Sequence, residues 1–393
     1  MAVRLTAERL VSAAQDDSAD AGITIRAELE PLGGDGTPVK PATYGGGQFQ
    51  HGRRWVGSGE DRHPVDILVI DNEPSQANRL EAALQDKRDV LGLPDIVLDL
   101  SSAGTLPPHL PREISMFQFP HRNADAYLRD SMVDGTPFAT SEVGEAIFEA
   151  TAASADALLA WCPQAPLFGF WQSHLGKKRS QAKKARSWAS EIIGLEPAAD
   201  DVRRLGTKGD PINLNAEEQV LVNEDDMSVW EFGEKPEKGE KRDKLAKVGH
   251  GQVPFPEDRQ ALSGVSFRQI LQQATVSFAS LRTVRTSSGA PEARAVLAAL
   301  GLVAHVAAFA RAFTLRSGAD LRPKTVSWRW LGARGDEDLE VPDFEAMAAI
   351  FSECVAQAEV AGVPVGSQWK EHRLTVSPSP SLLQAIKKSW PAT

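Results

Sequence analysis

The strongest chemical signal in the sequence is a run of cations that follows an aromatic cluster, between residues 167 and 194. Phe168, Phe170 and Trp171 precede six cations within ten positions, and no carboxylate lies between Trp171 and Ser190. Cations beside stacking rings are the groups that hold a nucleic-acid strand. The run therefore predicts a surface that binds a polyanion, with a solvated lysine-rich helix as the alternative. The six cations are Lys177, Lys178, Arg179, Lys183, Lys184 and Arg186.

Four polar residues at a predicted helix start form a second site of interest. The apolar run from Val65 to Asp71 predicts a buried strand, and residues 72–85 predict the helix that follows it. Free backbone N–H groups and the helix dipole favour a phosphate at such a start. Capping of the helix by Ser75 is the alternative. The residues predicted to contact the anion are Ser75, Gln76, Asn78 and Arg79.

Further arginines extend the predicted surface. Next to Arg122, the first of these arginines, His121 could form an acid–base pair with Asp125 or Asp130. Two arginines beside two aspartates are more often an ion-pair network that orders a turn. The arginines assigned to the surface are Arg122, Arg203, Arg204, Arg282 and Arg285.

The motifs of common enzyme classes are missing from the sequence. It contains no GxxxxGK[ST] loop, no strand-associated GxGxxG, no HExxH and no GxSxG elbow. Its eight histidines are scattered without the spacing of metal ligands. We therefore expect no cofactor, no metal and no catalytic residue.

Composition sets the class of protein. The chain has 393 residues and a formal net charge of -10, which argues against general adhesion to duplex DNA but allows a local basic groove. Two cysteines without a ligand-like cluster predict a reducing, cytoplasmic location. The most apolar run, Leu297 to Phe313, contains His305 and Arg311 and falls short of a membrane span. It predicts a buried helix rather than a membrane partner.

The predicted elements alternate between helices and strands. Ala182, Ala185, Ala189 and Ile192 recur at helical spacing, so we expect a helix from about 180 that Gly194 caps. Residues 195–262 alternate charges with glycine and proline, which predicts a projecting loop or a segment that orders on binding. The mixed order predicts an α+β fold that resembles a split βαβ sandwich with insertions. The predicted strands are 23–29, 65–71, 95–100, 274–286 and 326–330, and the predicted helices are 5–14, 72–85, 138–159, 180–194, 291–315 and 343–355.

Several runs together resemble a known family. In order and combination they are similar to the backbone subunit of type I-G (formerly I-U) CRISPR effector complexes, a member of the RAMP superfamily. The runs are IDNEPSQANRLEAAL at 70–84, HRNADAYLRDS at 121–131, LFGFWQSH at 167–174, SEIIG at 190–194 and VGHGQVPF at 248–255.

The resemblance implies a single RAMP-type domain over residues 1–393. This domain would have a modified RRM-like (ferredoxin-like) palm with finger and thumb insertions, the thumb being 195–262. It implies copies stacked helically along one CRISPR RNA, which pairs with target DNA, in a Cascade-type antiviral complex with other subunits. Ser75, Gln76 and Arg79 would then contact the RNA backbone.

The resemblance is compatible with more than one role for this protein. No aspartate stands out as a nuclease residue, so we expect a non-catalytic subunit. The alternatives are a RAMP-type endoribonuclease that processes CRISPR RNA with His121 or His174, and a protein scaffold without nucleic acid.

Overall fold

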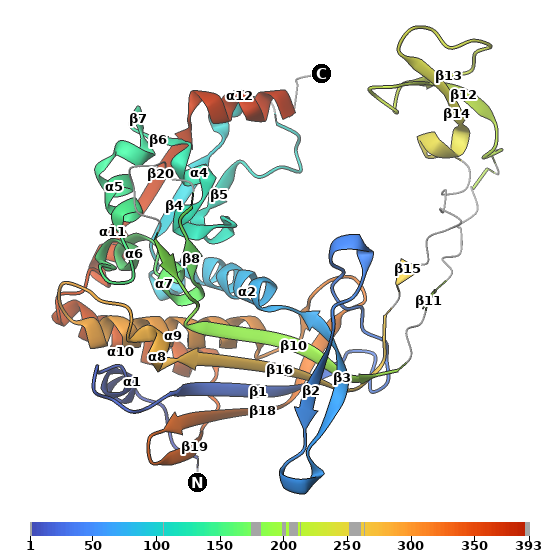
Figure 1. The fold of residues 1–393 in the computed structure, drawn as a ribbon. Coiled ribbons are helices and arrows are strands. Elements are labelled where there is room, and N and C mark those ends of the chain that lie inside the picture. The colour runs from blue at the N-terminus through green and yellow to red at the C-terminus, as the bar shows by residue number, and fades with distance from the viewer. Residues whose placement is uncertain are drawn as a thin grey trace. The chain divides into compact units, whose positions relative to one another are not determined.

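The structure is a computed structural model with two compact units (Figure 1). The first unit comprises Met1–Tyr44, Phe49–Pro197 and Ser266–Thr393, and the second comprises Gly45–Gln48 and Ala198–Val265. The second unit overlaps the insertion predicted at 195–262. The structure describes residues 2–104, 106–173, 182–198, 202–203, 211–212, 214–250, 261–262 and 264–389.

An antiparallel sheet organises the first unit. Its strands lie in the order β17–β18–β1–β16–β10–β3–β2, and β19 pairs with β18. In chain order the four central strands are β1, β10, β16 and β18. In the sheet they lie in the order β18, β1, β16, β10, that is, fourth, first, third and second. Their bounds are β1 Gly22–Pro31, β2 His51–Val56, β3 His63–Asp71, β10 Trp188–Pro197, β16 Phe267–Ser277, β17 Phe313–Thr314, β18 Asp320–Gly332 and β19 Gly335–Leu339.

Helices cover one face of this sheet. α9 contacts α1, α2 and α10, and Gly301 of α9 lies so close to Trp188 of β10 that a Cβ would come within 2.6 Å of the ring. The other face is polar over the centre of β1 and β16, where the cross-strand partners Arg26 and Gln273 are exposed. Toward β3 the same face carries a small apolar cluster of Val65, Ile67, Val69, Ile193, Leu195 and Leu271. The helices are α1 Ala7–Ala13, α2 Glu73–Asp86, α3 Arg88–Leu91, α4 Ala126–Arg129, α5 Glu142–Glu149, α6 Asp156–Trp161, α7 Gln164–Phe168, α8 Phe278–Leu281, α9 Ala290–Phe309, α10 Phe344–Val360, α11 Ser367–Glu371 and α12 Pro380–Ser389.

α9 is the buried helix that the apolar run predicts. Its length and hydropathy alone would allow it to cross a membrane, and it is the one helix with this property among the described residues. However, 83% of its apolar window is buried inside the fold. α9 therefore packs as the core helix of the first unit.

The helix predicted over 180–194 is wrong. Lys183–Lys184 form strand β9, which pairs with β8 (Phe170–Trp171), and β10 begins at Trp188. The small alanines match a helical period, but the burial of Ile192 and Ile193 between the neighbouring strands decides the structure. Gly194 is no helix cap, because it lies within β10. A Cβ there would lie 2.2 Å from the ring of Phe267.

Two other predicted elements differ from the structure. The helix predicted over 138–159 is divided into α5 and α6, because the chain leaves helical geometry at Ala150. The strand predicted over 274–286 ends at Ser277, whose side chain accepts a hydrogen bond from the N–H of Ser280 and starts α8. The Ser277 cap thus ends the strand, although the alternation of apolar and polar residues continues beyond it in the sequence.

A smaller sheet completes the first unit. Its order is β5–β4–β20–β6–β7, and β4 and β20 are parallel. The strands are β4 Asp95–Asp99, β5 Glu113–Ser115, β6 Ser131–Val133, β7 Thr136–Pro137 and β20 Arg373–Pro378. With the large sheet, these strands confirm the α+β class with several antiparallel pairings.

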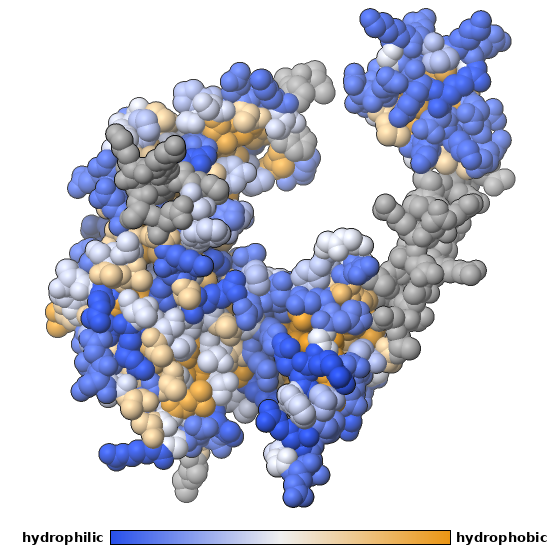
Figure 2. All heavy atoms as spheres, in the orientation of Figure 1, coloured by the Kyte–Doolittle hydropathy of each residue, from blue (hydrophilic) through white to orange (hydrophobic). Residues whose placement is uncertain are grey.

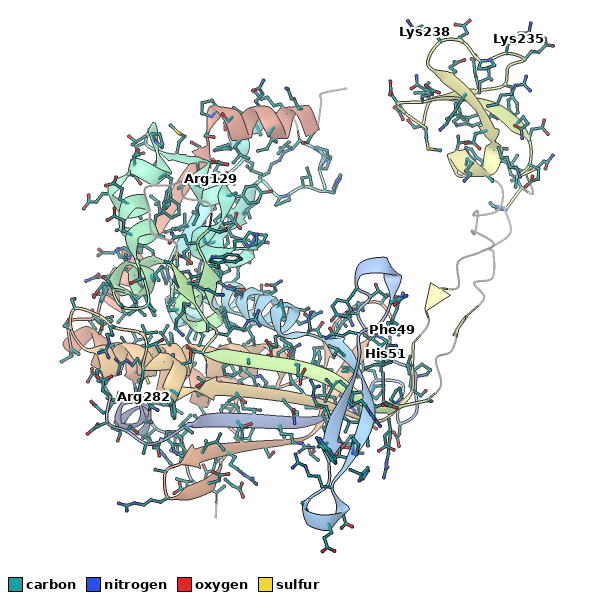
Figure 3. The ribbon with its side chains drawn as sticks, in the orientation of Figure 1. Phe49, His51, Arg129, Lys235, Lys238 and Arg282 are labelled. Carbon is teal, nitrogen blue, oxygen red and sulfur yellow. The ribbon has the colours of Figure 1, made fainter. Side chains whose placement is uncertain are left out.

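The second unit contains a three-stranded sheet rather than the predicted projecting loop. Val220, Val222 and Leu245 form a small core, which the charge-rich composition concealed. The surface of this unit is mostly hydrophilic (Figure 2), and Lys235 and Lys238 project from the connection between β13 and β14 (Figure 3). The strands are β12 Gln219–Asn223, β13 Trp230–Glu231 and β14 Glu240–Lys244. A separate two-stranded sheet is formed by β11 Val202–Arg203 and β15 Ala261–Leu262.

Candidate nucleic-acid interface

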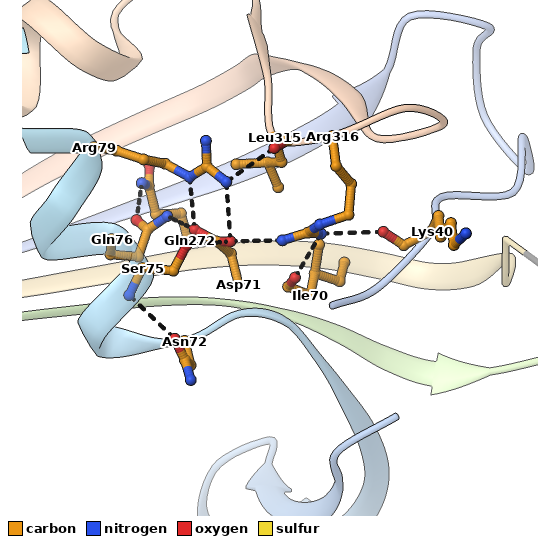
Figure 4. Close-up of polar contacts among 10 residues, drawn as sticks. All are labelled: Lys40, Ile70, Asp71, Asn72, Ser75, Gln76, Arg79, Gln272, Leu315 and Arg316. Carbon is orange, nitrogen blue, oxygen red and sulfur yellow. Dashed lines mark hydrogen bonds and ion pairs between the residues drawn. The ribbon is translucent and has the colours of Figure 1, made fainter. Parts of the chain in front are cut away.

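A buried carboxylate at the end of β3 collects four polar side chains (Figure 4). The Asp71 side chain is 0% exposed. Ser75 Oγ donates to Asp71 Oδ1 at 2.9 Å, and Gln76 Nε2 donates to Oδ2 at 2.7 Å. Arg79 Nε donates to Oδ2 at 2.9 Å, and Arg316 Nη2 donates to Oδ1 at 2.7 Å. The end of β3 and the first turn of α2 are thereby fixed to each other.

This Asp71 cluster carries excess positive charge. Two guanidinium groups face one carboxylate, and the side chains of Arg79 and Arg316 remain 26% and 25% exposed. Burial by itself would raise the pKa of Asp71, but the hydrogen bond and charge of Arg79 outweigh burial and hold the pKa below its usual value. Asp71 is therefore ionised at neutral pH, and the guanidinium groups of Arg79 and Arg316 are oriented around it.

The start of α2 differs in detail from its prediction. Asn72, not Ser75, caps the helix by accepting a hydrogen bond from the Ser75 N–H at 3.1 Å. Gln76 is buried and accepts a hydrogen bond from Gln272 at 2.9 Å. Asn78 is exposed. Of the four predicted residues, Asn78 is thus exposed, Ser75 and Arg79 are half-buried, and Gln76 is buried.

A pocket of about 530 Å³ lies beside this helix start. Arg122 enters it while pairing with Glu81 of α2 at 2.7 Å and donating to the Gly169 carbonyl at 3.0 Å. Arg186 at its rim pairs with Glu73, also on α2. The same helix therefore connects the Asp71 cluster to the pocket. The lining residues are Pro120, His121, Arg122, Ala124, Phe168, Gly169, Phe170, Trp171, Ser173, Lys184, Ala185 and Arg186.

The two described lysines of the cationic run have different environments. Lys184 is 6% exposed, and its Nζ donates to Ala185 O at 2.8 Å, Ser187 Oγ at 3.0 Å and Ser280 Oγ at 2.9 Å. Burial lowers its pKa to about 8. Lys183 is exposed and lies 5.6 Å above the Trp171 ring.

The remaining predicted arginines lie elsewhere. Arg282 donates to the carbonyls of Ala13 at 3.1 Å and Asp20 at 3.2 Å, so it ties the end of α1 to the sheet (Figure 3). Arg285 is 60% exposed and lies 3.8 Å from Asp16. Neither of these described arginines lines the pocket. Arg203 lies in β11. The side chain of Arg203 and the residues Lys177, Lys178, Arg179, Arg204 and His174 lie outside the part of the chain that the structure describes.

The acidic residues near His121 have structural contacts. Asp125 is 3% exposed and accepts hydrogen bonds from the backbone N–H groups of His121 at 2.8 Å and Tyr127 at 2.9 Å. Asp130 pairs with Arg129 at 2.7 Å. The expected ion-pair network is present in part: Arg129 pairs with Asp130, whereas Arg122 pairs with Glu81 and backbone N–H groups hold Asp125.

Sequence reasoning missed Arg316. It lies 245 positions from Asp71 and also donates to the carbonyls of Ile70 at 2.9 Å and Lys40 at 3.1 Å. No local pattern marks this arginine. The sequence feature that could have predicted such a partner is Asp71 itself, because an acid at the end of a buried strand requires cationic or polar partners.

A comparison with family models finds that part of the chain is similar to a family of CRISPR-associated (Cas) proteins. Residues 23–198 match the family described as CRISPR-associated protein GSU0053. The match covers slightly less than half of the chain and includes β1, α2, the Asp71 carboxylate and the pocket. No curated protein matches the chain. The predicted CRISPR resemblance is thus confirmed at the level of a Cas family.

Proposed function

We propose that the protein is a non-catalytic backbone subunit of a type I-G CRISPR effector complex in the cytoplasm. In this role it binds guide RNA independently of sequence, stacks with further copies along the guide, and joins other subunits so that the guide can pair with target DNA. The GSU0053 family match supports the CRISPR context. The strand order fourth, first, third, second, with α2 and α9 as the two crossover helices, supports an RRM-like, ferredoxin-like palm.

The observation that carries this proposal is the Asp71 cluster. A buried carboxylate holds Arg79 and Arg316 in fixed orientations, while a quarter of each side chain stays accessible. Arg79 uses Nε and Nη2 for Asp71 and the Leu315 carbonyl, which leaves its Nη1 donors for a phosphate oxygen. Because these two are held in place before binding, they lose less conformational entropy when a phosphate arrives. Contacts with phosphates carry no base identity, which suits a subunit that must accept any guide.

The test is RNA binding at graded salt concentrations. The chain is co-expressed with a CRISPR transcript, and long RNA-bound assemblies are sought by electron microscopy. Arg79→Ala should reduce the logarithmic salt slope by about 0.7, the value for one phosphate contact on a single strand. Arg329→Ala is the matched control, because Arg329 is exposed and paired with Asp338 on the edge hairpin β18–β19. Equal slopes for the two variants would refute the assignment of the cluster.

The cationic run supplies a second arm of this test. If four of its cations between Lys177 and Arg186 contact phosphates, the full slope should be about -3. Alanine at Lys177, Lys178, Arg179, Lys183 and Lys184 should abolish long assemblies. Unchanged binding would remove this run from the proposed interface.

One observation favours the endoribonuclease alternative. His121 shares a pocket with Lys184, and an imidazole beside an amine can move protons at a ribose hydroxyl. Pure protein is incubated with repeat RNA, with His121→Ala as the comparison. The backbone proposal expects intact RNA with both proteins, whereas cleavage that disappears in His121→Ala would establish the alternative.

A further inference from the structure

A second pocket, with mostly apolar walls, lies at the C-terminal end of α9; we name it the His305 pocket. One wall is a row of cross-strand neighbours on β16, β1 and β18, namely Gln272, Ala27 and Val326. The rings of Phe309 and Trp328 also line the pocket. Its volume is about 260 Å³, and an apolar cavity of about 150 Å³ is enough to bind benzene. The His305 pocket therefore has room for a substituted aromatic ring.

His305 is a polar residue of this pocket without a hydrogen-bond partner. It is 5% exposed, and its ring centroid lies 5.7 Å from that of Trp188 and 5.4 Å from that of Phe309. No hydrogen bond joins either ring nitrogen to a residue that the structure describes, and Nδ1 is fully buried. Nε2, at the far end of the ring, is thus the nitrogen that can meet a ligand. Because a buried polar group without a partner costs free energy, a ligand that supplies one is favoured.

The surroundings of His305 favour a ligand without charge. Burial lowers the pKa of His305 to about 3, so the imidazole is neutral at neutral pH. The exposed Asp343 also lines the pocket, and its carboxylate disfavours an anion. A neutral imidazole has one N–H donor and one acceptor nitrogen. A hydroxyl group can donate or accept, so it suits either tautomer of His305.

Gln272 supplies a second polar group, and its hydrogen bonds fix which atom is free. Gln76 donates through Nε2 to Asp71 Oδ2 at 2.7 Å, so the Oε1 atom of Gln76 is left to accept. Gln272 Nε2 donates to that Oε1 at 2.9 Å. The free acceptor of Gln272 is therefore its own Oε1, to which no described residue donates.

We propose that the His305 pocket binds a small uncharged aromatic alcohol, with its ring against Phe309 and Trp328 and its hydroxyl group beside His305 and Gln272. Contacts between aromatic rings stabilise such a complex beyond the area that they bury. The inference does not depend on RNA binding, since none of the described residues assigned to RNA lines this pocket.

The experiment titrates the full chain with phenol and with toluene and follows binding by NMR. The two probes have nearly the same shape and differ in one hydroxyl group. The wild type should bind phenol. His305→Leu should lower the ratio of phenol affinity to toluene affinity about two- to tenfold, the loss expected from one hydrogen bond. A change in this ratio cancels the cost of removing each probe from water.

Two further variants locate the site. Val326 is half-buried and lines the pocket, so Val326→Phe should abolish the binding of both probes by filling the space. His51→Leu is the matched control for the loss of an imidazole, since His51 is exposed and does not line the described pocket. It should leave both affinities unchanged.

Three results would overturn the proposal. They are no binding of phenol to the wild type, an affinity ratio that His305→Leu leaves at the wild-type value, and phenol binding that Val326→Phe leaves unchanged. Thermal melting of each variant confirms that it folds, and Val326→Phe keeps the test decisive if His305→Leu does not. RNA binding by the same wild-type preparation is measured separately. Its absence would refute the backbone role and leave the assignment of the His305 pocket intact.

Discussion

Replacement of Asp71 by asparagine tests the Asp71 cluster most directly. Asparagine keeps the shape of the side chain, but it removes the charge and turns one acceptor into a donor that faces guanidinium donors. Loss of one partner from a buried ion pair costs about 3–5 kcal/mol, because the remaining charge has no partner. We expect Asp71→Asn to lower the free energy of unfolding by an amount in this range. Asp71 is 0% exposed, and its partners are two arginines that are only a quarter exposed.

Asp66→Asn is the control on the same strand. Asp66 also pairs with an arginine, Arg53, at 3.1 Å, but the two side chains are 73% and 68% exposed. Exposed pairs contribute about 0–1 kcal/mol. The two substitutions therefore have the same chemistry and differ in burial.

Urea unfolding followed by tryptophan fluorescence measures this difference. The chain has nine tryptophans, and Trp230 is the one that belongs to the second unit, so the signal reports mainly on the first unit. A cost for Asp71→Asn as small as that for Asp66→Asn would contradict the buried network. It would also remove the argument that Arg79 and Arg316 are oriented before they bind.

Three further predictions concern pH and packing. The folded pKa of Asp71 lies below the unfolded value, so its contribution to stability is present above about pH 4 and is lost as pH falls through the folded pKa. Acid unfolding of Asp71→Asn, followed by fluorescence, should therefore depend less steeply on pH than that of the wild type. The pKa of Lys184 is lowered from 10.5 to about 8, so the unfolded chain holds this proton longer and wild-type stability should rise between these pH values. Urea titrations should show no such rise in Lys184→Met. Gly194→Ala should destabilise the first unit by about 1–3 kcal/mol because its Cβ would meet Phe267 at 2.2 Å, whereas calorimetry should find little change for Gly45→Ala, where no atom lies within 4 Å.

Local signals in the sequence were sufficient for part of the site. The apolar run before Asp71 and the spacing of Ala77, Leu80 and Leu84 predict β3 and the core stripe of α2, and all three side chains are buried. Both elements have boundaries that their own residues determine, a run of strand-forming side chains and then a helix start with Pro74 in its first turn.

Non-local contacts account for what the sequence did not reveal. The Asp71 cluster depends on Arg316, which reaches it from the segment between α9 and β18. Residues 188–197 form a strand because β3 and β16 flank them on both sides, and no spacing of alanines can report those neighbours. The propensity of a short segment is weak compared with such tertiary pairing.

The connection between β10 and β16 has a consequence for how this protein can change. Pro197 and Phe267 are directly opposed in the antiparallel pairing, so everything from residue 198 to residue 266 occupies the place of a hairpin turn. The cost of closing a flexible loop grows only slowly with its length, by about 0.6 kcal/mol for each doubling. The connection between β10 and β16 can therefore be replaced. A tight glycine-containing turn, or an unrelated small domain with adjacent termini, can join the two strands while the sheet keeps its register.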